Sequence, residues 1–279
     1  MAKERDIEEA ILGALRYSNI FSYPLSFFQI GLYLGQKTSI EELQKNLKIL
    51  VKKKAITKRE NVYKLTKVQN VNWNQKQAQS KKLFKKYSKL LKKLEKIPWI
   101  QMIALTGSVA ASNPEENDDI DIFIITKKNR LWITRFFIVV YLKAWDTYRT
   151  EQEPNGKICP NLLITENNMV WPQGKQNLYV ASEIVRMQPV FDRENAYLRF
   201  LTKNKWIEKY FPNFVFEGVE KKGEFWTFLP NPLDLVEMLF YLSQRFFMKN
   251  KITTEEIKRN FIHFNKYDRT NEILEKYGE

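Results

Sequence analysis

Residues 103–126 read Ile-Ala-Leu-Thr-Gly-Ser-Val-Ala-Ala-Ser-Asn-Pro-Glu-Glu-Asn-Asp-Asp-Ile-Asp-Ile-Phe-Ile-Ile-Thr, and this stretch decides the fold. An apolar run leads into Gly107-Ser108, a polar loop follows, and Asp119-Ile-Asp121 opens a second apolar run. Short apolar runs bounded by turn residues are typical of buried strands. The pattern therefore predicts two strands at the centre of the chain, with polar side chains at their ends.

The acidic residues at the head of the second run are spaced for one shared face. Successive side chains of a strand point to opposite faces, so Asp119 and Asp121 project together while Ile120 and Ile122 face the core. Two such carboxylates repel each other unless a cation lies between them, and hard divalent ions prefer oxygen ligands. The alternative is an acidic pair that only caps a turn.

The Gly-Ser pair before the loop argues against that alternative. Gly107 ends the first strand, and glycine lets the backbone approach a ligand closely. Ser108 begins a predicted short helix over residues 108–112, where backbone amides and a hydroxyl form a phosphate cradle. A phosphate cradle beside an acidic pair predicts a site for a nucleoside triphosphate.

The two elements together resemble a known family. Apolar strand, Gly107-Ser108, ten intervening residues and Asp119-Ile-Asp121 are similar to the nucleotidyltransferase superfamily of the DNA polymerase beta type. The resemblance implies an α/β (α+β) fold, with a small mixed sheet and flanking helices. It implies that Asp119 and Asp121 hold Mg²⁺ (or Mn²⁺) and that Gly107 and Ser108 bind the triphosphate. A nucleoside monophosphate would then move to an unidentified acceptor hydroxyl, in nucleic acid or another molecule.

The sequence departs from the family pattern in the next strand, predicted over residues 157–165. Active members of the family carry a third carboxylate there, whereas this strand has Asn161 in its middle and Glu166 at its end. We predict Asn161 as the third catalytic position. Arg186, at the end of a predicted helix over 177–187, is predicted to contact the nucleotide; an ion pair with Glu183 is the alternative.

This departure leaves three functions open. The first is an active nucleotidyltransferase, which we take as the leading hypothesis. The second is a catalytically impaired regulator that binds nucleotide at this site and nucleic acid elsewhere. The third is a protein-modifying transferase of the toxin–antitoxin type, whose N-terminal domain docks on a partner protein. The sequence leaves the acceptor, the base preference and the oligomeric state undetermined.

The N-terminal region predicts a domain of its own. Residues 6–66 read as three helices followed by a hairpin, which is the order of a winged helix-turn-helix, and the resemblance includes a branch with such a domain ahead of the transferase core. The predicted third helix exposes polar and basic residues that could contact nucleic acid. They are Gln44, Lys45, Lys48 and Lys52.

The whole chain divides into four predicted regions. They are a winged helix at 1–70, a basic linking helix at 71–98, a nucleotidyltransferase core at 99–190, and a helical C-terminal region at 191–279. The last region is predicted to close with helices over 233–249 and 255–265, after an aromatic-rich connection over 212–231.

The composition limits the remaining possibilities. The chain of 279 residues has 46 Lys and Arg against 32 Asp and Glu, a net charge of +14 that favours a polyanionic partner or reflects solvated lysines. One cysteine excludes an internal disulfide and argues against a thiolate zinc site, and one histidine removes most histidine-based triads. Carboxylates must therefore carry the chemistry. We find neither a secretory signal pattern nor an apolar run of about 20 residues, and we expect a cytoplasmic protein with no membrane association.

Overall fold

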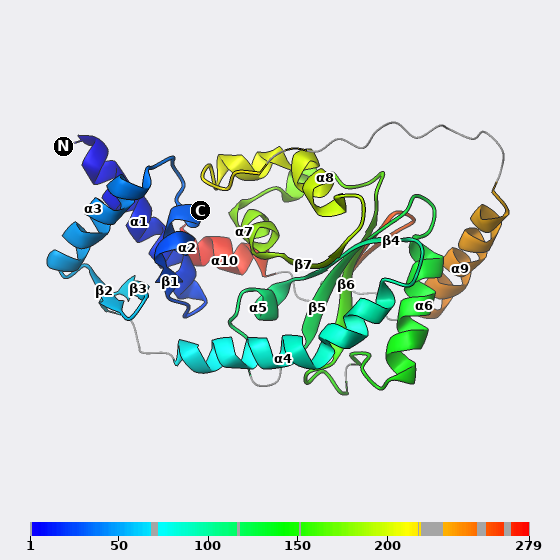
Figure 1. Ribbon diagram of the computed structural model, residues 1–279. Coiled ribbons are helices and arrows are strands. Elements are labelled where there is room, and N and C mark those ends of the chain that lie inside the picture. Colours follow the sequence, from blue (N-terminus) through cyan, green and yellow to red (C-terminus); the bar gives the residue numbers. More distant parts are fainter. Residues whose placement is uncertain are drawn as a thin grey trace.

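The computed structural model describes residues 2–67, 72–115, 118–150, 152–216, 218, 231–249, 255–264 and 269–278. Within these ranges six strands form one mixed sheet in the order β7-β4-β5-β6-β9-β8 (Figure 1). β5 and β6 run parallel, and their other neighbours pair antiparallel. The strands are β4 (Ile100–Leu105), β5 (Ile120–Thr126), β6 (Ile158–Thr165), β7 (Gln188–Asp192), β8 (Glu256–Lys258) and β9 (Phe261–His263). The predicted fold class, a mixed sheet with flanking helices, is confirmed.

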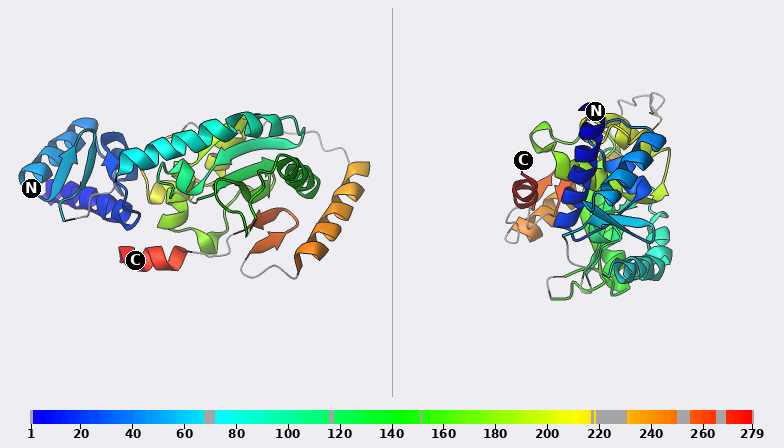
Figure 2. Two further views of the ribbon diagram at one scale, coloured as in Figure 1. Left: turned by 90° about the horizontal axis from the view of Figure 1, so that it is seen from below. Right: turned by 90° about the vertical axis from the view of Figure 1, so that its left-hand side faces the viewer.

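Helices cover both faces of this sheet, because the central strands are apolar on both sides. Ile103 and Ile122 face a cluster with α4 (Trp73–Leu94) and α6 (Leu131–Ala144). Phe123 and its neighbours face the opposite cluster. That cluster includes residues of α7 (Leu178–Arg186), α8 (Ala196–Lys203) and α10 (Thr270–Tyr277). Figure 2 shows α4 lying along the sheet.

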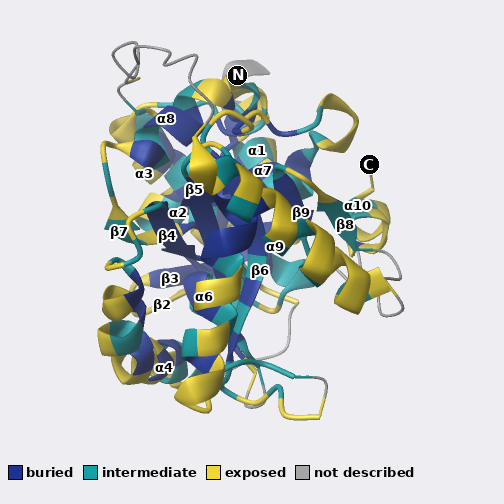
Figure 3. Cartoon of the chain, turned by 90° about the vertical axis from the view of Figure 1, so that its right-hand side faces the viewer, coloured by how far each residue is buried: buried dark blue, intermediate teal, exposed yellow. Residues whose placement is uncertain are grey.

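Shorter elements connect these layers. α5 (Gly107–Ala110) links β4 to the polar loop before β5, and two 3₁₀ turns lie at Gln173–Lys175 and Lys205–Lys209. α9 (Pro232–Met248) packs on α6 and is mostly exposed, whereas the central strands are buried (Figure 3). No helix in the described part of the chain is long and apolar enough to span a bilayer.

The N-terminal unit has a separate core. In the described part it contains α1 (Ala2–Ile20), β1 (Leu25–Ser26), α2 (Phe27–Tyr33), α3 (Ile40–Lys52), β2 (Ile56–Arg59) and β3 (Val62–Leu65). The strands form a small antiparallel sheet in the order β1-β3-β2. Ser39 caps α3 by accepting a hydrogen bond from the Glu42 amide. The three helices and the hairpin are present, and strand β1 is an addition that the sequence pattern did not reveal.

The C-terminal region differs from the prediction. Residues 255–265 were predicted as a helix, but Glu256–Lys258 and Phe261–His263 form a hairpin whose second strand extends the sheet beside β6. Ile262 is fully buried against the strand partner Leu163, so pairing with β6 overrides the local pattern. Strand β7 and helix α10 were also not predicted. Most of the aromatic connection predicted over 212–231 lies outside the described residues.

Candidate functional site

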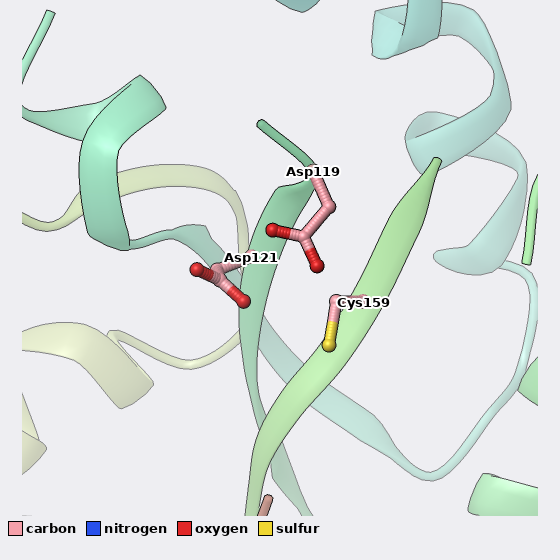
Figure 4. A group of neighbouring side chains, drawn as sticks. All are labelled: Asp119, Asp121 and Cys159. Atoms are coloured by element: carbon pink, nitrogen blue, oxygen red, sulfur yellow. The ribbon is translucent and has the colours of Figure 1, made fainter. Parts of the chain in front are cut away.

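Two adjacent parallel strands bring three possible ligand groups together. Asp119 immediately precedes β5, Asp121 lies in β5, and Cys159 in β6 is the register partner of Asp121. Among the described residues, one donor atom from each of these side chains lies within 4.8 Å of the other two. Figure 4 shows both carboxylates and the thiol on the same side of the strands. The two carboxylates of the predicted acidic pair therefore lie close together in the structure.

Without a cation, the negative charges of the buried carboxylates in this site repel one another. Burial, together with the negative charges of Asp119 and Glu183, raises the pKa of Asp121 to about 7. Burial also raises the pKa of Asp119, although the Arg149 guanidinium opposes this shift from an Nε to Oδ2 distance of 3.1 Å. A divalent cation between the carboxylates would relieve this repulsion.

Cys159 contributes a neutral thiol to this group. Burial, together with the nearby carboxylates Asp121 and Asp119, raises the pKa of the thiol well above its ordinary value. A protonated thiol is a poor ligand for a hard cation, because Mg²⁺ prefers oxygen donors. Asp119 and Asp121 therefore fit a single hard divalent cation, while Cys159 occupies the neighbouring position without supplying a third carboxylate.

Gly107 allows the turn after β4 to approach the acidic pair closely. Its φ is +63°, in the left-handed region that favours glycine, and a Cβ there would lie 2.6 Å from Oδ2 of Asp121. The Thr106 amide donates to the Asp121 carbonyl at 3.0 Å, which fixes this approach. Ser108 follows in the first turn of α5, where backbone N–H groups have no partner within the helix. The predicted phosphate cradle thus lies directly beside the predicted metal ligands.

A third acidic residue, which the sequence did not single out as a site residue, contacts the same turn. The Gly107 N–H donates to the carboxylate of Glu183, which projects from α7. Glu183 in turn pairs with Arg186, with an Nη1 to Oε1 distance of 3.8 Å. The turn at Gly107 therefore meets acidic side chains from both β5 and α7. Local sequence carries no signal for this contact, since it depends on how α7 packs.

Arg186 lines the site but is held by the N-terminal unit. Its guanidinium lies 5.9, 5.3 and 5.6 Å from the ring centroids of Tyr17, Phe21 and Tyr33. These cation–π contacts and the ion pair with Glu183 stabilise the positive charge of the guanidinium. Arg186 therefore forms the ion pair with Glu183 that was the alternative. It also lies at the edge of the predicted nucleotide site.

A cleft joins these groups to the N-terminal unit. It has a volume of about 750 Å³, within the range of roughly 300–1,000 Å³ that is usual for ligand pockets. The core supplies one wall, which includes Gly107, Ser108, Asp119, Asp121, Glu183 and Arg186. The N-terminal unit supplies the other wall, which includes Phe21, Tyr23, Gln29 and Tyr33.

The third catalytic position predicted from the sequence does not join the group. Asn161 is not among the described residues that line the cleft, and its buried side-chain oxygen has no hydrogen-bond partner in the described structure. The register of β5 with β6 pairs Asp121 with Cys159, and Asn161 lies two residues farther along β6. A register shift there gives the strand partners to Pro160 and Leu162 and leaves Asn161 between them. Glu166 lies beyond the far end of β6 and pairs with Arg199 at 3.5 Å.

The basic residues predicted to contact nucleic acid lie on the exposed surface of α3, away from these groups. They are Gln44, Lys45, Lys48 and Lys52. None of them is among the described residues that line the cleft.

Comparison with known families agrees with the geometry of the acidic pair and the Gly-Ser turn. The family model of the nucleotidyltransferase domain matches residues 84–231, just over half of the chain. The chain belongs to this family. No curated protein and no solved structure matches it. The nucleotidyltransferase domain includes Gly107, Ser108, both aspartates and Cys159, so the residues that converge in space all lie inside the matched range.

Proposed function

We propose that the protein is a Mg²⁺-dependent (or Mn²⁺-dependent) nucleotidyltransferase that moves a nucleoside monophosphate from a nucleoside triphosphate to an acceptor hydroxyl. The observation that carries this proposal is the convergence of Asp119 and Asp121 beside the Gly107-Ser108 turn. Membership of the nucleotidyltransferase domain family supports it.

In this proposal each group has a separate task. Asp119 and Asp121 hold the divalent cation, which neutralises phosphate charge and polarises the reacting oxygens when bound. Ser108 offers a hydroxyl and a first-turn backbone amide to the terminal phosphates. Glu183 holds Gly107 so that the turn keeps its shape. The acceptor oxygen bonds to the α-phosphorus, the bond to the pyrophosphate oxygen breaks, and the hydroxyl proton is lost.

A second candidate function follows from Cys159. The strand partner of Asp121 is the neutral thiol of Cys159, so the site offers two carboxylates rather than three. Two carboxylates are enough to hold one metal with a triphosphate, but they provide less for activation of the acceptor hydroxyl. This observation favours a nucleotide-binding regulator that no longer transfers.

We further propose that the N-terminal unit is a winged helix-turn-helix domain. The element order α1-β1-α2-α3-β2-β3 and the sheet order β1-β3-β2 support this assignment. Such a domain could bind nucleic acid through α3, or it could dock on a partner protein in a toxin–antitoxin pair. Both functions remain to be tested. We keep its boundary near residue 70 as part of the proposal, with the transferase core beginning near residue 99 and the C-terminal region near residue 191.

The test separates nucleotide binding from transfer. We would titrate ATP, GTP, CTP and UTP by calorimetry with and without Mg²⁺, on the wild-type protein and on Asp121→Asn. Asp146→Asn is the matched control, because this aspartate has a side chain 91% exposed and is not among the described cleft residues. We expect Mg²⁺-dependent binding that Asp121→Asn abolishes and Asp146→Asn keeps. Equal binding by all three proteins would refute the site.

The same proteins are then incubated with α-labelled nucleotide and a pool of RNA, peptides and small hydroxyl compounds. Label transferred by the wild type and by Asp146→Asn, but not by Asp121→Asn, establishes the transferase. Nucleotide binding without transfer to any acceptor supports the regulator instead.

A further inference from the structure

The positive charge of the chain is concentrated on one helix. Residues 73–96, under a tenth of the chain, contain nine lysines and one glutamate, so they carry eight of the fourteen net positive charges. A charge so localised calls for a physical explanation beyond general solubility.

Eight of the nine lysines in this segment lie on the side away from the core. Leu83, Tyr87, Leu91 and Leu94 are buried and pack against the sheet. Eight exposed lysines lie opposite this stripe: Lys81, Lys82, Lys85, Lys86, Lys89, Lys92, Lys93 and Lys96. With 3.6 residues per turn they span an arc of about 140°, and every residue of 81–96 that falls within this arc is lysine. We call these eight residues the lysine face.

A solvated helix surface is usually built differently. Exposed helices place acidic and basic residues three or four apart, where they attract each other. On the lysine face such neighbours are both cations, as at Lys81 and Lys85 or Lys85 and Lys89, and like charges at this spacing destabilise the helix. None of the eight lysines forms an ion pair within the described part of the chain. A polyanion laid along the helix would replace this repulsion by attraction.

Aromatic rings flank the lysine face and indicate what kind of polyanion fits. Trp145, at the end of α6, is 56% exposed, and the Lys93 ammonium lies 4.8 Å from its ring centroid. Phe84 on α4 is 40% exposed. Exposed rings beside cations are the stacking platforms on which proteins bind unpaired bases. An amphipathic helix that lies in a membrane surface inserts its apolar face, whereas the apolar face of α4 is buried against the sheet.

The lysine face also leads to the nucleotide site. The first turns of α4 meet the cleft: Lys76 lines it and donates to Glu115 at 2.5 Å, and Ser80 donates to the Val109 carbonyl of α5 at 2.7 Å. From there the 22 residues of α4 extend for about 33 Å along the core (Figure 2). A strand bound along α4 can therefore place one end in the cleft.

We propose that the lysine face and Trp145 bind a single-stranded nucleic acid whose terminal hydroxyl is the acceptor. The acceptor role rests on the proposed function, while binding to the surface does not. In the reaction the terminal oxygen of the strand bonds to the α-phosphorus, pyrophosphate leaves with the electrons of the broken bond, and the hydroxyl proton passes to solvent. The product is the strand lengthened by one nucleotide.

The test compares two triple variants with the same change in charge. Lys85→Gln with Lys89→Gln and Lys92→Gln removes charge from α4. Lys203→Gln with Lys205→Gln and Lys209→Gln removes the same charge from exposed positions at the end of α8 and in the 3₁₀ turn that follows it. We would measure the anisotropy of a labelled 20-nucleotide single-stranded RNA over a range of salt. We expect the α4 triple to bind at least tenfold more weakly and to lose roughly 2 units of the log–log salt slope, at about 0.7 per neutralised phosphate. The Lys203, Lys205 and Lys209 triple should retain wild-type affinity.

Trp145→Ala adds an independent readout, since the loss of base stacking should lower RNA affinity by about fivefold or more with an unchanged salt slope. Both α4 and Trp145 variants should keep Mg²⁺-dependent ATP binding and wild-type thermal unfolding, which separates this surface from the nucleotide site.

Three results would overturn the proposal. Equal losses in the two triple variants would show that net charge alone, rather than α4, attracts RNA. Absence of RNA binding by the wild type would show that the lysine face does not bind nucleic acid. Binding of the wild type to phosphatidylserine vesicles, lost in the α4 triple while RNA affinity is retained, would identify a membrane partner. RNA bound through α4 without label transfer would confirm the surface and overturn its acceptor role.

Discussion

Replacement of Gly107 by alanine tests the close contact on which the site depends. The backbone at Gly107 has φ +63°, which is unfavourable for any residue with a Cβ, and the new methyl group would lie 2.6 Å from Oδ2 of Asp121. The Cβ and Cγ of Asp121 are also close, at 3.4 Å, so the whole side chain must move by several tenths of an ångström. The carboxylate would then leave its place beside Asp119.

Two contributions to the expected effect can be separated. The left-handed backbone costs about 1–2 kcal/mol of folding free energy, offset in part by the lower entropy of the unfolded alanine chain. The displacement of Asp121 acts on binding instead. A ligand group misplaced by up to 1 Å can lower activity by about 100-fold, so we expect Mg²⁺-dependent nucleotide affinity to fall by about 10- to 100-fold.

Gly156→Ala is the matched control. Gly156 has nearly the same φ, +61°, but its new Cβ would lie 3.8 Å from Cδ2 of Leu83, which is ordinary van der Waals contact. Urea unfolding in EDTA should show similar losses of stability in the two variants. Calorimetric titration of ATP with Mg²⁺ should show weakened binding in Gly107→Ala alone. If both variants bind nucleotide equally well, the contact between the turn and Asp121 has no role in the site.

Three further predictions concern single side chains. The Asp121 carboxyl has a pKa of about 7 in the folded protein against 3.8 for an ordinary aspartate, so the fold binds this proton more tightly than the unfolded chain does. In EDTA the wild type should therefore lose stability relative to Asp121→Asn between about pH 4 and about pH 7, with a constant difference above that; a flat difference across this range in urea unfolding would contradict the buried charge. Cys159→Asp places a carboxylate opposite Asp121 and should raise Mg²⁺ affinity roughly tenfold, about 1.4 kcal/mol, by calorimetry. An unchanged affinity would mean that position 159 does not face the ion. Glu237 is 2% exposed and accepts from the amides of Trp132 and Ile133 at 2.7 and 2.9 Å, so Glu237→Ala should cost about 3 kcal/mol in thermal or chemical unfolding, and Glu237→Gln about half as much. If both variants are as stable as the wild type, these contacts do not anchor α9 to α6.

The sequence alone determined the centre of the protein. Strands β4 and β5, the Gly107-Ser108 turn and the shared face of Asp119 and Asp121 all follow from neighbouring residues. These features are predictable because the alternation of side chains along a strand, and the need for glycine at a left-handed turn, are local properties of the chain.

Only the tertiary structure decided which other residues join the site. Cys159, rather than Asn161, lies beside Asp121, because the register of β5 with β6 pairs Asp121 with Cys159. Glu183 reaches the Gly107 amide only through the packing of α7. The same holds for the cleft wall from the N-terminal unit and for the strands β8 and β9. Each depends on segments far apart in the sequence, whose register and packing no local pattern specifies.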